Sequence, residues 1–280
     1  MIHDSVKSAS ASKCGSSHSK NNQQELVKKA LSKIKNKFLV MSGKGGVGKS
    51  SIAANISMLL AQKGFKVGLM DVDVHGPSIA RIMGLKGLLD ITQDKQLIPV
   101  PIGDNLKVIS MQSLMQEENQ AVIWRGPVKA GLIHQFIGNV KWDNLDYLII
   151  DSPPGTGDEP LTVVQAIDDA KAIIITTPQE VALSDVRKSI NFCKTVNLEP
   201  LGLIENMGPF TCPGCQTQIS LFKNGGGERT AREMDIPFLG TLPFEPAVVE
   251  ACDNGKPIVS EKSDSEFTMA LDRIVTGIIG

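Results

Sequence analysis

Short apolar runs alternate along this chain with longer segments whose apolar positions recur at helical spacing. Short runs that are apolar throughout are typical of strands buried on both faces of a parallel sheet. The predicted strands cover residues 38–41, 66–71, 106–111, 146–151, 172–177, 201–206 and 238–240, and the predicted helices cover residues 24–35, 50–63, 120–140, 179–196, 245–254 and 264–278. This alternation predicts the α/β class with a doubly wound, mostly parallel sheet.

A glycine-rich loop joins the first predicted strand to its helix, and its sequence, GKGGVGKS, fits the phosphate-binding pattern G-x-x-x-x-G-K-[ST] at every fixed position. Glycines let backbone N–H groups approach a triphosphate closely, and the following helix presents its positive end to the same phosphates. We predict that Lys49 neutralises the β- and γ-phosphates and that the Ser50 hydroxyl binds Mg²⁺. The predicted contacts of ATP are Gly43, Lys44, Gly45, Gly46, Val47, Gly48, Lys49, Ser50 and Ser51. The alternative is an ordinary glycine-rich turn between a strand and a helix.

A second lysine, Lys44, directly follows the first glycine of the loop. This arrangement resembles the deviant Walker A loop of the dimeric ATPases that include the nitrogenase iron protein and MinD. The resemblance implies that Lys44 reaches across a dimer interface to the partner's nucleotide, as a catalytic residue. The alternative is a solvated loop lysine.

Two predicted strands end in acid, and carboxylates at the carboxyl end of a parallel strand lie where open α/β sheets bind ligands. The first strand leads into Asp71 and Asp73 within DVDVHGPS. We predict that Asp73 positions or activates the attacking water and that Asp71 acts on Mg²⁺ through its water shell; a purely structural turn is the alternative. The second strand ends at Asp151, the expected Walker B carboxylate, and Gly155 follows it within a loop expected to approach the γ-phosphate.

Three further parts of the chain receive predictions. Asn206 ends another predicted strand, and we expect its amide to contact adenine. Residues 86–105 carry scattered glycine, proline and aspartate, which indicates a loop or hairpin. The serine-rich segment 1–24 has almost nothing apolar to bury and is predicted to be a disordered tail preceding one P-loop ATPase domain over residues 25–280.

Composition narrows the function classes. The 280-residue chain is 41% hydrophobic and 21% charged with a formal net charge of −1, which gives no electrostatic footprint for nucleic acid. No apolar run approaches the ~20 residues that span a bilayer, so no membrane interaction is expected. Five cysteines, an odd number, argue against a secreted disulfide scaffold and favour a cytoplasmic protein with reduced thiols.

A second motif, CPGC, follows the Asn206 strand closely and presents Cys212 and Cys215 in a Gly/Pro turn. One C-x-x-C supplies two ligands, whereas a closed zinc site or a four-iron cluster needs four. Two copies related by a twofold axis supply four thiolates, which agrees with the dimer that Lys44 implies. The alternatives are a redox C-x-x-C and a bridging structural zinc ion. Cys252 either assists this site or is a buried structural thiol, and Cys14 is expected to be a free thiol rather than half of a metal site with His18.

Six motifs occur in order over about residues 36–275: GKGGVGKS, DVDVHGPS, WRGP, DSPPGTGDE, ENM with CPGC, and LPFEP. Together they resemble the Mrp/ApbC/Nbp35 family of iron–sulfur cluster carriers. The resemblance implies a homodimer, or a heterodimer with a paralogue, that binds and slowly hydrolyses ATP. It also implies that the dimer takes a labile [4Fe–4S] cluster from an assembly scaffold, holds it on Cys212 and Cys215 of each subunit, and passes it to apo-proteins. Because Cys14 stands alone, the second, amino-terminal cluster of some members is not expected.

Three other functions remain open at this point. A MinD-like positioning ATPase acting at a membrane leaves CPGC unexplained and has Arg273 as the one cation of residues 265–280. A reductase like the nitrogenase iron protein keeps its cluster bound while it passes electrons. A zinc-bridged ATPase scaffold uses the same four thiolates for structure.

Overall fold

The computed structural model describes residues 16–74, 76–114, 126–212 and 214–279. Its centre is an eight-stranded sheet in the order β10-β7-β6-β1-β5-β2-β4-β3. Every neighbouring pair is parallel except β3 and β4. The strands are β1 (Ile34–Ser42), β2 (Val67–Asp71), β3 (Val100–Ile102), β4 (Leu106–Ser110), β5 (Leu145–Asp151), β6 (Lys171–Thr176), β7 (Glu199–Gly208) and β10 (Phe238–Pro243). The predicted doubly wound α/β fold is confirmed.

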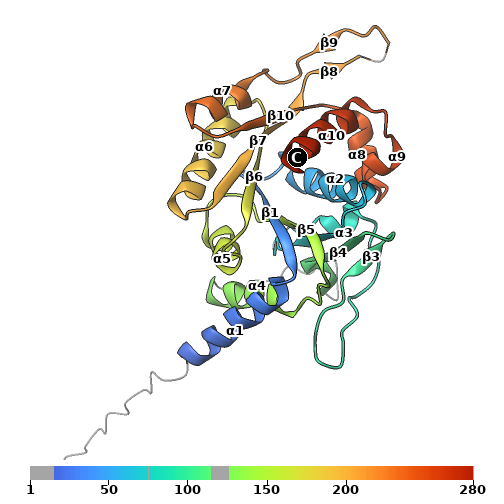
Figure 1. Ribbon diagram of the computed structural model, residues 1–280. Coiled ribbons are helices and arrows are strands. Elements are labelled where there is room, and N and C mark those ends of the chain that lie inside the picture. The colour runs from blue at the N-terminus through green and yellow to red at the C-terminus, as the bar shows by residue number, and fades with distance from the viewer. Residues whose placement is uncertain (1–15, 75, 115–125, 213, 280) are drawn as a thin grey trace, which may run out of the picture.

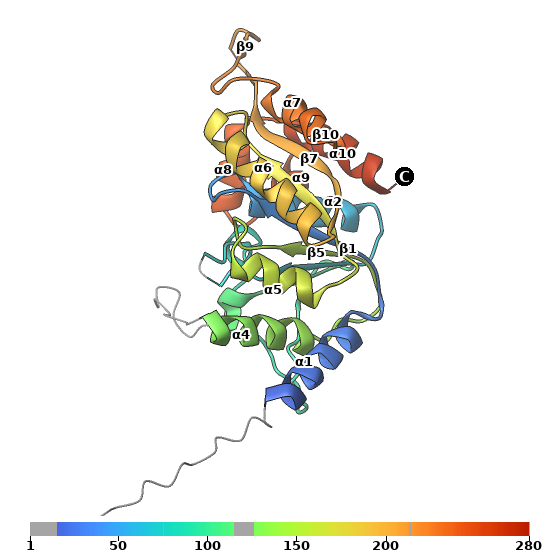
Figure 2. The ribbon, with the colours of Figure 1, turned by 90° about the vertical axis from the view of Figure 1, so that its left-hand side faces the viewer.

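Helices cover both faces of this sheet (Figures 1 and 2). One hydrophobic cluster lies beneath α1 (Ser16–Leu31), α4 (Gly126–Asn139), α5 (Asp158–Ala166), α6 (Glu180–Thr195) and α7 (Gly226–Glu233). The other lies beneath α2 (Lys49–Gln62), α3 (Ile79–Ile82), α8 (Pro246–Asp253), α9 (Ile258–Glu261) and α10 (Glu266–Ile279). A short 3₁₀ helix, η1 (Met111–Leu114), follows β4.

The central strand β1 explains where the site lies. It pairs with β5 on one side and β6 on the other, and the chain continues from β1 to β2 on one side and later crosses to β6 on the other. Ligands of open α/β sheets bind outside the carboxyl ends of the strands at such a reversal. The carboxyl ends of β1, β2, β5 and β7 therefore converge on one site.

The amino-terminal region differs from its prediction. Helix α1 already begins at Ser16 and ends at Leu31, whereas the sequence predicted a tail to residue 24 and a helix over 24–35. Strand β1 begins at Ile34, four residues before the predicted run. The strand tolerates the buried, charged Lys37 because its ammonium donates to the carbonyl of Ile34 at 3.0 Å and to Asp169 at 2.7 Å. Residues 1–15, which include Cys14, lie outside the described residues.

A small hairpin projects from the body of the molecule after β7 (Figure 1). Its strands, β8 (Phe210–Thr211) and β9 (Gln218–Ile219), pair antiparallel, and the CPGC segment lies between them. Neither the hairpin nor helices α5 and α7 were predicted. In residues 86–105, the structure has an isolated antiparallel bridge between Ile91 and Leu97 and the short edge strand β3, which agrees with a hairpin insertion.

Candidate functional site

The glycine-rich loop leads from β1 directly into α2, as the sequence predicted. Gly48 is the N-cap residue of α2 with a φ of 84°, and no side chain caps the helix. No acidic residue lies in the first turn of α2. The positive end of the helix and its unpaired N–H groups are therefore available to an anion such as phosphate.

Two glycines of the loop are required for reasons that the sequence did not show. A Cβ at Gly43 would lie 2.4 Å from the carbonyl carbon of Asp185, so this glycine permits close packing against α6. This packing gives Gly43 a second reason to be glycine, and its predicted contact with the phosphates stays a prediction. A Cβ at Gly48 would lie 2.3 Å from Nδ2 of Asn206, whereas Gly45 and Gly46 face open space.

The lysine assigned to phosphate and the carboxylate assigned to magnesium form one ion pair. Nζ of Lys49 donates to Oδ1 of Asp151 at 2.5 Å and lies 3.4 Å from Oγ of Ser50. Oδ2 of Asp151 is buried without a hydrogen-bond partner among the described residues. Burial raises the pKa of Asp151, while the charge of Lys49 opposes that rise. An orphaned carboxylate oxygen beside a serine hydroxyl is a donor set that suits Mg²⁺.

Asp71 lies in register with Asp151 on the neighbouring strand and is fully buried. Its Oδ1 accepts the N–H of Asp73, and its Oδ2 accepts the N–H of Ile79 at 3.2 Å and the hydroxyl of Ser110 at 2.9 Å. Burial and the nearby charge of Asp151 raise the pKa of Asp71 to about 7. With both oxygens engaged, Asp71 holds the loop after β2 in place, and its predicted action on magnesium stays a prediction.

The loops that follow β2 and β5 contain Asp73 and Gly155, which were predicted to act on the attacking water and near the γ-phosphate. Asp73 lines the cavity described below, and its Oδ1 accepts the N–H of Gly76 at 3.0 Å. The N–H of Gly155, expected near the γ-phosphate, donates instead to the carbonyl of Ser42 at 2.8 Å. An approach of Gly155 to phosphate requires this hydrogen bond to break, so that role stays a prediction.

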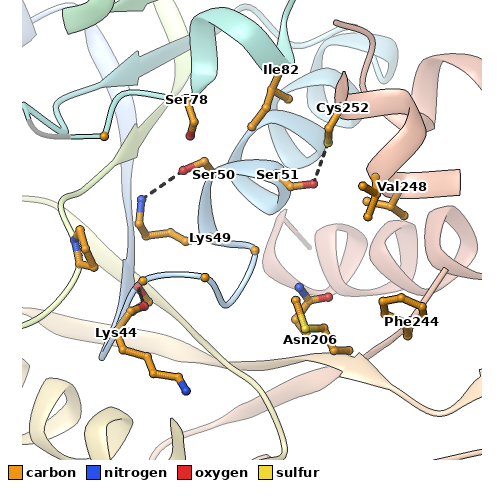
Figure 3. Close-up of a pocket in the computed structure, with 18 of the residues that line it drawn as sticks. Lys44, Lys49, Ser50, Ser51, Ser78, Ile82, Asn206, Phe244, Val248 and Cys252 are labelled. Carbon is orange, nitrogen blue, oxygen red and sulfur yellow. Dashed lines mark hydrogen bonds between the residues drawn. The ribbon is translucent and has the colours of Figure 1, made fainter. Parts of the chain in front are cut away.

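A cavity of about 730 Å³ extends from the glycine-rich loop to helix α8 (Figure 3). At its polar end it is lined by Lys44, Gly45, Gly46, Gly48, Lys49, Ser50, Ser51 and Asp73. At its other end it is lined by Asn206, Met207, Pro243, Phe244 and Val248. A polar, cationic end beside an apolar end matches the phosphates and the base of a nucleotide.

Asn206 lies at the boundary between these two ends. Its Nδ2 donates to the carbonyl of Val47 at 2.9 Å, so the amide nitrogen supports the glycine-rich loop. The side-chain oxygen remains for the predicted contact with adenine. Sequence reasoning did not identify Met207, Phe244 or Val248, because nothing in their local pattern marks them as cavity residues.

Cys252 also belongs to this cavity. Its Sγ lies 3.3 Å from Oγ of Ser51 on helix α2 (Figure 3). Of the two alternatives for Cys252, this contact between α8 and α2 favours a structural thiol over one that assists the CPGC pair. Burial raises the pKa of the Cys252 thiol.

Lys44 behaves differently from Lys49. Figure 3 shows its ammonium on the opposite side of the loop, pointing away from Lys49 and Ser50. The side chain is half-buried. This direction agrees with a lysine that does not serve the phosphates of its own chain.

Cys212, Gly214 and Cys215 lie in the loop that joins the two strands of the projecting hairpin. The N–H of Cys212 donates to the carbonyl of Thr217 at 3.0 Å, and the N–H of Gln216 donates to the carbonyl of Cys212 at 2.8 Å. Both thiols are free, and Cys215 is exposed. Hydrogen bonds from Thr217, with a further contribution from Cys212, lower the pKa of the Cys215 thiol. Within the described part of the chain, no three His, Cys, Asp or Glu side chains come together as a metal site, so this loop offers two ligands.

The family described as "ParA: NUBPL iron-transfer P-loop NTPase" matches residues 33–279 of this chain. The chain belongs to this family. Membership in the iron-transfer P-loop NTPases confirms the resemblance that the six motifs indicated, and it confirms a nucleotide-binding protein of the P-loop class.

Two relatives show how far the similarity extends. An iron-sulfur cluster carrier protein of Methanocaldococcus jannaschii is 42% identical over 261 residues, which cover 92% of this chain and 90% of the relative. A cytosolic Fe-S cluster assembly factor NUBP2 homolog of Culex quinquefasciatus is 45% identical over 254 residues, covering 89% and 98%. Both similarities therefore extend over nearly the whole of this chain and of each relative.

Solved structures agree with the fold. A nucleotide-binding protein of Archaeoglobus fulgidus in complex with ADP is 38% identical, with a TM-score of 0.74 over 87% of this chain and 95% of that chain. The MinD cell division protein of Aquifex aeolicus, at 23% identity, has a TM-score of 0.64 over 88% and 97%. At that identity the likeness to MinD shows the fold alone.

Several other residues and features of the sequence can be located in the structure or lie outside its described part. Trp124, Arg125 and His75 lie outside the described residues, while Gly126 and Pro127 begin α4. Cys193 is buried in the core on α6, and burial raises its pKa to about 11. In the described ranges, no helix has the length and apolar character needed to cross a bilayer.

Proposed function

We propose that this chain is an ATP-binding and ATP-hydrolysing carrier that holds a labile [4Fe–4S] cluster between two subunits and transfers it to apo-proteins. The observation that carries the proposal is the combination, in one chain, of a complete phosphate-binding loop and a free two-cysteine loop outside the nucleotide cavity. The names of the two relatives, a cluster carrier and a cytosolic cluster assembly factor, support it and favour a cytosolic location.

The nucleotide half of the mechanism follows from the cavity. The loop and the amino-terminal end of α2 would bind the phosphates, while Asn206 and the apolar end would hold the base. Ser50 and the free oxygen of Asp151 would hold Mg²⁺, which neutralises phosphate charge when bound. Lys49 would exchange its contact with Asp151 for a contact with phosphate. Asp73 lines the cavity where it can orient a water molecule for hydrolysis.

The cargo half follows from the number of ligands. Cys212 and Cys215 of one chain supply two thiolates, and a second copy, or a paralogue, completes the four that a four-iron cluster needs. The exposed position of Cys215 leaves the cluster open to an acceptor. Ligation shared between two chains is released when the chains separate, so the dimer that Lys44 is proposed to stabilise would control delivery.

The proposal is tested by anaerobic reconstitution followed by transfer to the apo form of a four-iron ferredoxin. Cys212→Ala should lose iron and sulfide but keep ATP binding. Lys49→Ala should keep the cluster but lose ATP binding, by about 100-fold or more, together with any ATP-dependent transfer. Cys193→Ala is the matched control, because this thiol is buried in the core and should leave both functions intact.

Three results would contradict the proposal. A Cys212→Ala chain with a full complement of iron and sulfide would remove the carrier function. Stoichiometric zinc with no iron after anaerobic purification would favour the zinc-bridged scaffold. A cluster that stays bound through turnover with an apo-acceptor present would favour the reductase.

A further inference from the structure

The base end of the nucleotide cavity is adjacent to the root of the CPGC hairpin. Strand β7 pairs with β10 through Glu205 with Thr241 and through Gly208 with Pro243, so two residues of β7 lie opposite one residue of β10. This bulge contains Met207, a non-glycine residue with a φ of 59° that also lines the cavity. Bulges redirect side chains and are frequent beside functional sites. Here the bulge directs the chain out of the sheet toward Cys212.

One aromatic residue contacts both regions. Phe244 lines the cavity, and its N–H donates to the carbonyl of Gly208 at 3.2 Å. Its ring meets the ring of Phe210 edge to face, with centroids 6.2 Å apart and an interplanar angle of 75°. Phe210 begins β8 and lies two residues before Cys212. Figure 3 shows Phe244 beside Asn206 at the base end of the cavity.

The returning arm of the hairpin is fixed by a different group. Glu205 is fully buried, and its carboxylate accepts the N–H of Gly227 at 2.6 Å and the N–H of Gly225 at 3.4 Å. These glycines begin helix α7, where the hairpin segment rejoins the body of the molecule. The returning arm is therefore anchored to β7 away from the cavity, whereas the outgoing arm contacts a residue of the cavity wall.

We propose that Phe210, through its contact with Phe244, is the positioning residue by which occupancy of the nucleotide cavity sets the position of Cys212. The inference rests on the proposed function, since it links the nucleotide site to the cluster ligands. A base at the apolar end of the cavity contacts Phe244, and a change in that ring moves Phe210 and the segment that follows it. The anchored returning arm converts this movement into a change within the CPGC loop.

The test measures thiol reactivity in the full-length, reduced chain without a cluster. Iodoacetamide labelling is followed for each cysteine by peptide mass spectrometry, with and without Mg-ADP, at a protein concentration where light scattering shows monomer. Cys252 lines the cavity and reports occupancy, and the buried Cys193 reports unfolding. This readout requires neither cluster binding nor transfer.

The decisive variant is Phe210→Leu, and the matched control is Phe222→Leu. Phe222 belongs to the returning segment of the same hairpin, and no ring contact of it occurs among the described residues. In the wild type and in Phe222→Leu, ADP should change the labelling rate of Cys212 by roughly twofold to tenfold, the range that one aromatic contact can supply. In Phe210→Leu this change should disappear while ADP still protects Cys252, and Phe210→Tyr should restore it.

The outcomes separate this inference from the proposed function. If ADP protects Cys252 but leaves the Cys212 rate unchanged in the wild type, the inference is overturned and the nucleotide site stands. The inference also fails if Phe210→Leu retains the response, or if both leucine variants lose it equally. If ADP neither binds nor protects Cys252, the proposed function fails as well.

Discussion

Gly48 meets two demands at a single residue. Its φ of 84° lies in the left-handed region that favours glycine, and its α-carbon faces the amide of Asn206. That amide supports the loop through the carbonyl of Val47. The glycine required by the motif is therefore needed by the protein's own packing as well as by the phosphates.

This double role gives a prediction for stability without nucleotide. Gly48→Ala should lower the free energy of unfolding by at least ~2 kcal/mol, because the new methyl group collides with Nδ2 of Asn206 and the backbone is strained. Gly45→Ala is the matched control, since a Cβ there meets no atom within 4 Å, and it should be nearly neutral. Urea denaturation measures both. Equal losses in the two variants would show that the contact with Asn206 does not matter.

At the scale of elements, the start of α7 is fixed by one buried side chain. Its sequence, GGERTARE, begins with two glycines and buries only Gly226, Gly227, Thr230 and Ala231, so its own apolar contacts are few. Glu205 at the end of β7 accepts two N–H groups at the start of this helix and lies 3.4 Å from the hydroxyl of Thr241. A carboxylate at a helix amino terminus is stabilised by the exposed N–H groups and the helix dipole.

Removing this carboxylate should therefore loosen α7 in particular. Glu205→Ala leaves buried N–H groups unsatisfied and should cost about 2–3 kcal/mol of unfolding free energy. Hydrogen exchange should accelerate most at the Gly227 amide. Glu199→Ala is the matched control on the same strand, because its ion pair with Lys171 is exposed and contributes little. Unchanged exchange at Gly227 in Glu205→Ala would contradict the anchoring role.

The limits of sequence reasoning also appear at this scale. The apolar runs and the acids that end them were enough to predict the central strands and to place Asp71, Asp151 and Asn206 at one edge, because parallel strands share their carboxyl ends. Helix α7 was missed because its short sequence is mostly polar and because Glu205, which accepts an N–H at its start, lies 22 residues away. Apart from Asn206, the base end of the cavity was missed because it joins the β7 bulge to α8, a contact between segments remote in sequence.

At the scale of the whole molecule, the chain contains a complete nucleotide cavity and half of the proposed cluster site. The nucleotide cavity lies within one chain, whereas the CPGC loop, on a projecting hairpin, would provide two of the four ligands of the proposed cluster (Figure 2). Lys44 and the hairpin are thus the two features whose proposed roles require a second copy. Nucleotide binding by one chain and association of two chains should be separable by mutation.

Lys44→Ala should separate them. Because the Lys44 ammonium points away from Lys49 and Ser50, its removal should leave the affinity of the monomer for ADP within about twofold, while ATP-driven dimerisation should weaken by about tenfold or more, as expected when an interfacial charge contact is lost. ATP hydrolysis should fall to a similar extent if the lysine acts on the partner's nucleotide. Sedimentation velocity with ATP and fluorescence titration with a labelled ADP measure the two effects independently. Lys63→Ala is the matched control, since this lysine is the C-cap residue of α2, at the end of the helix away from the glycine-rich loop, and pairs with Asp272 of α10. A loss of ADP affinity in Lys44→Ala as large as in Lys49→Ala would show that Lys44 serves its own phosphates, and the shared-site mechanism would then lack its nucleotide trigger.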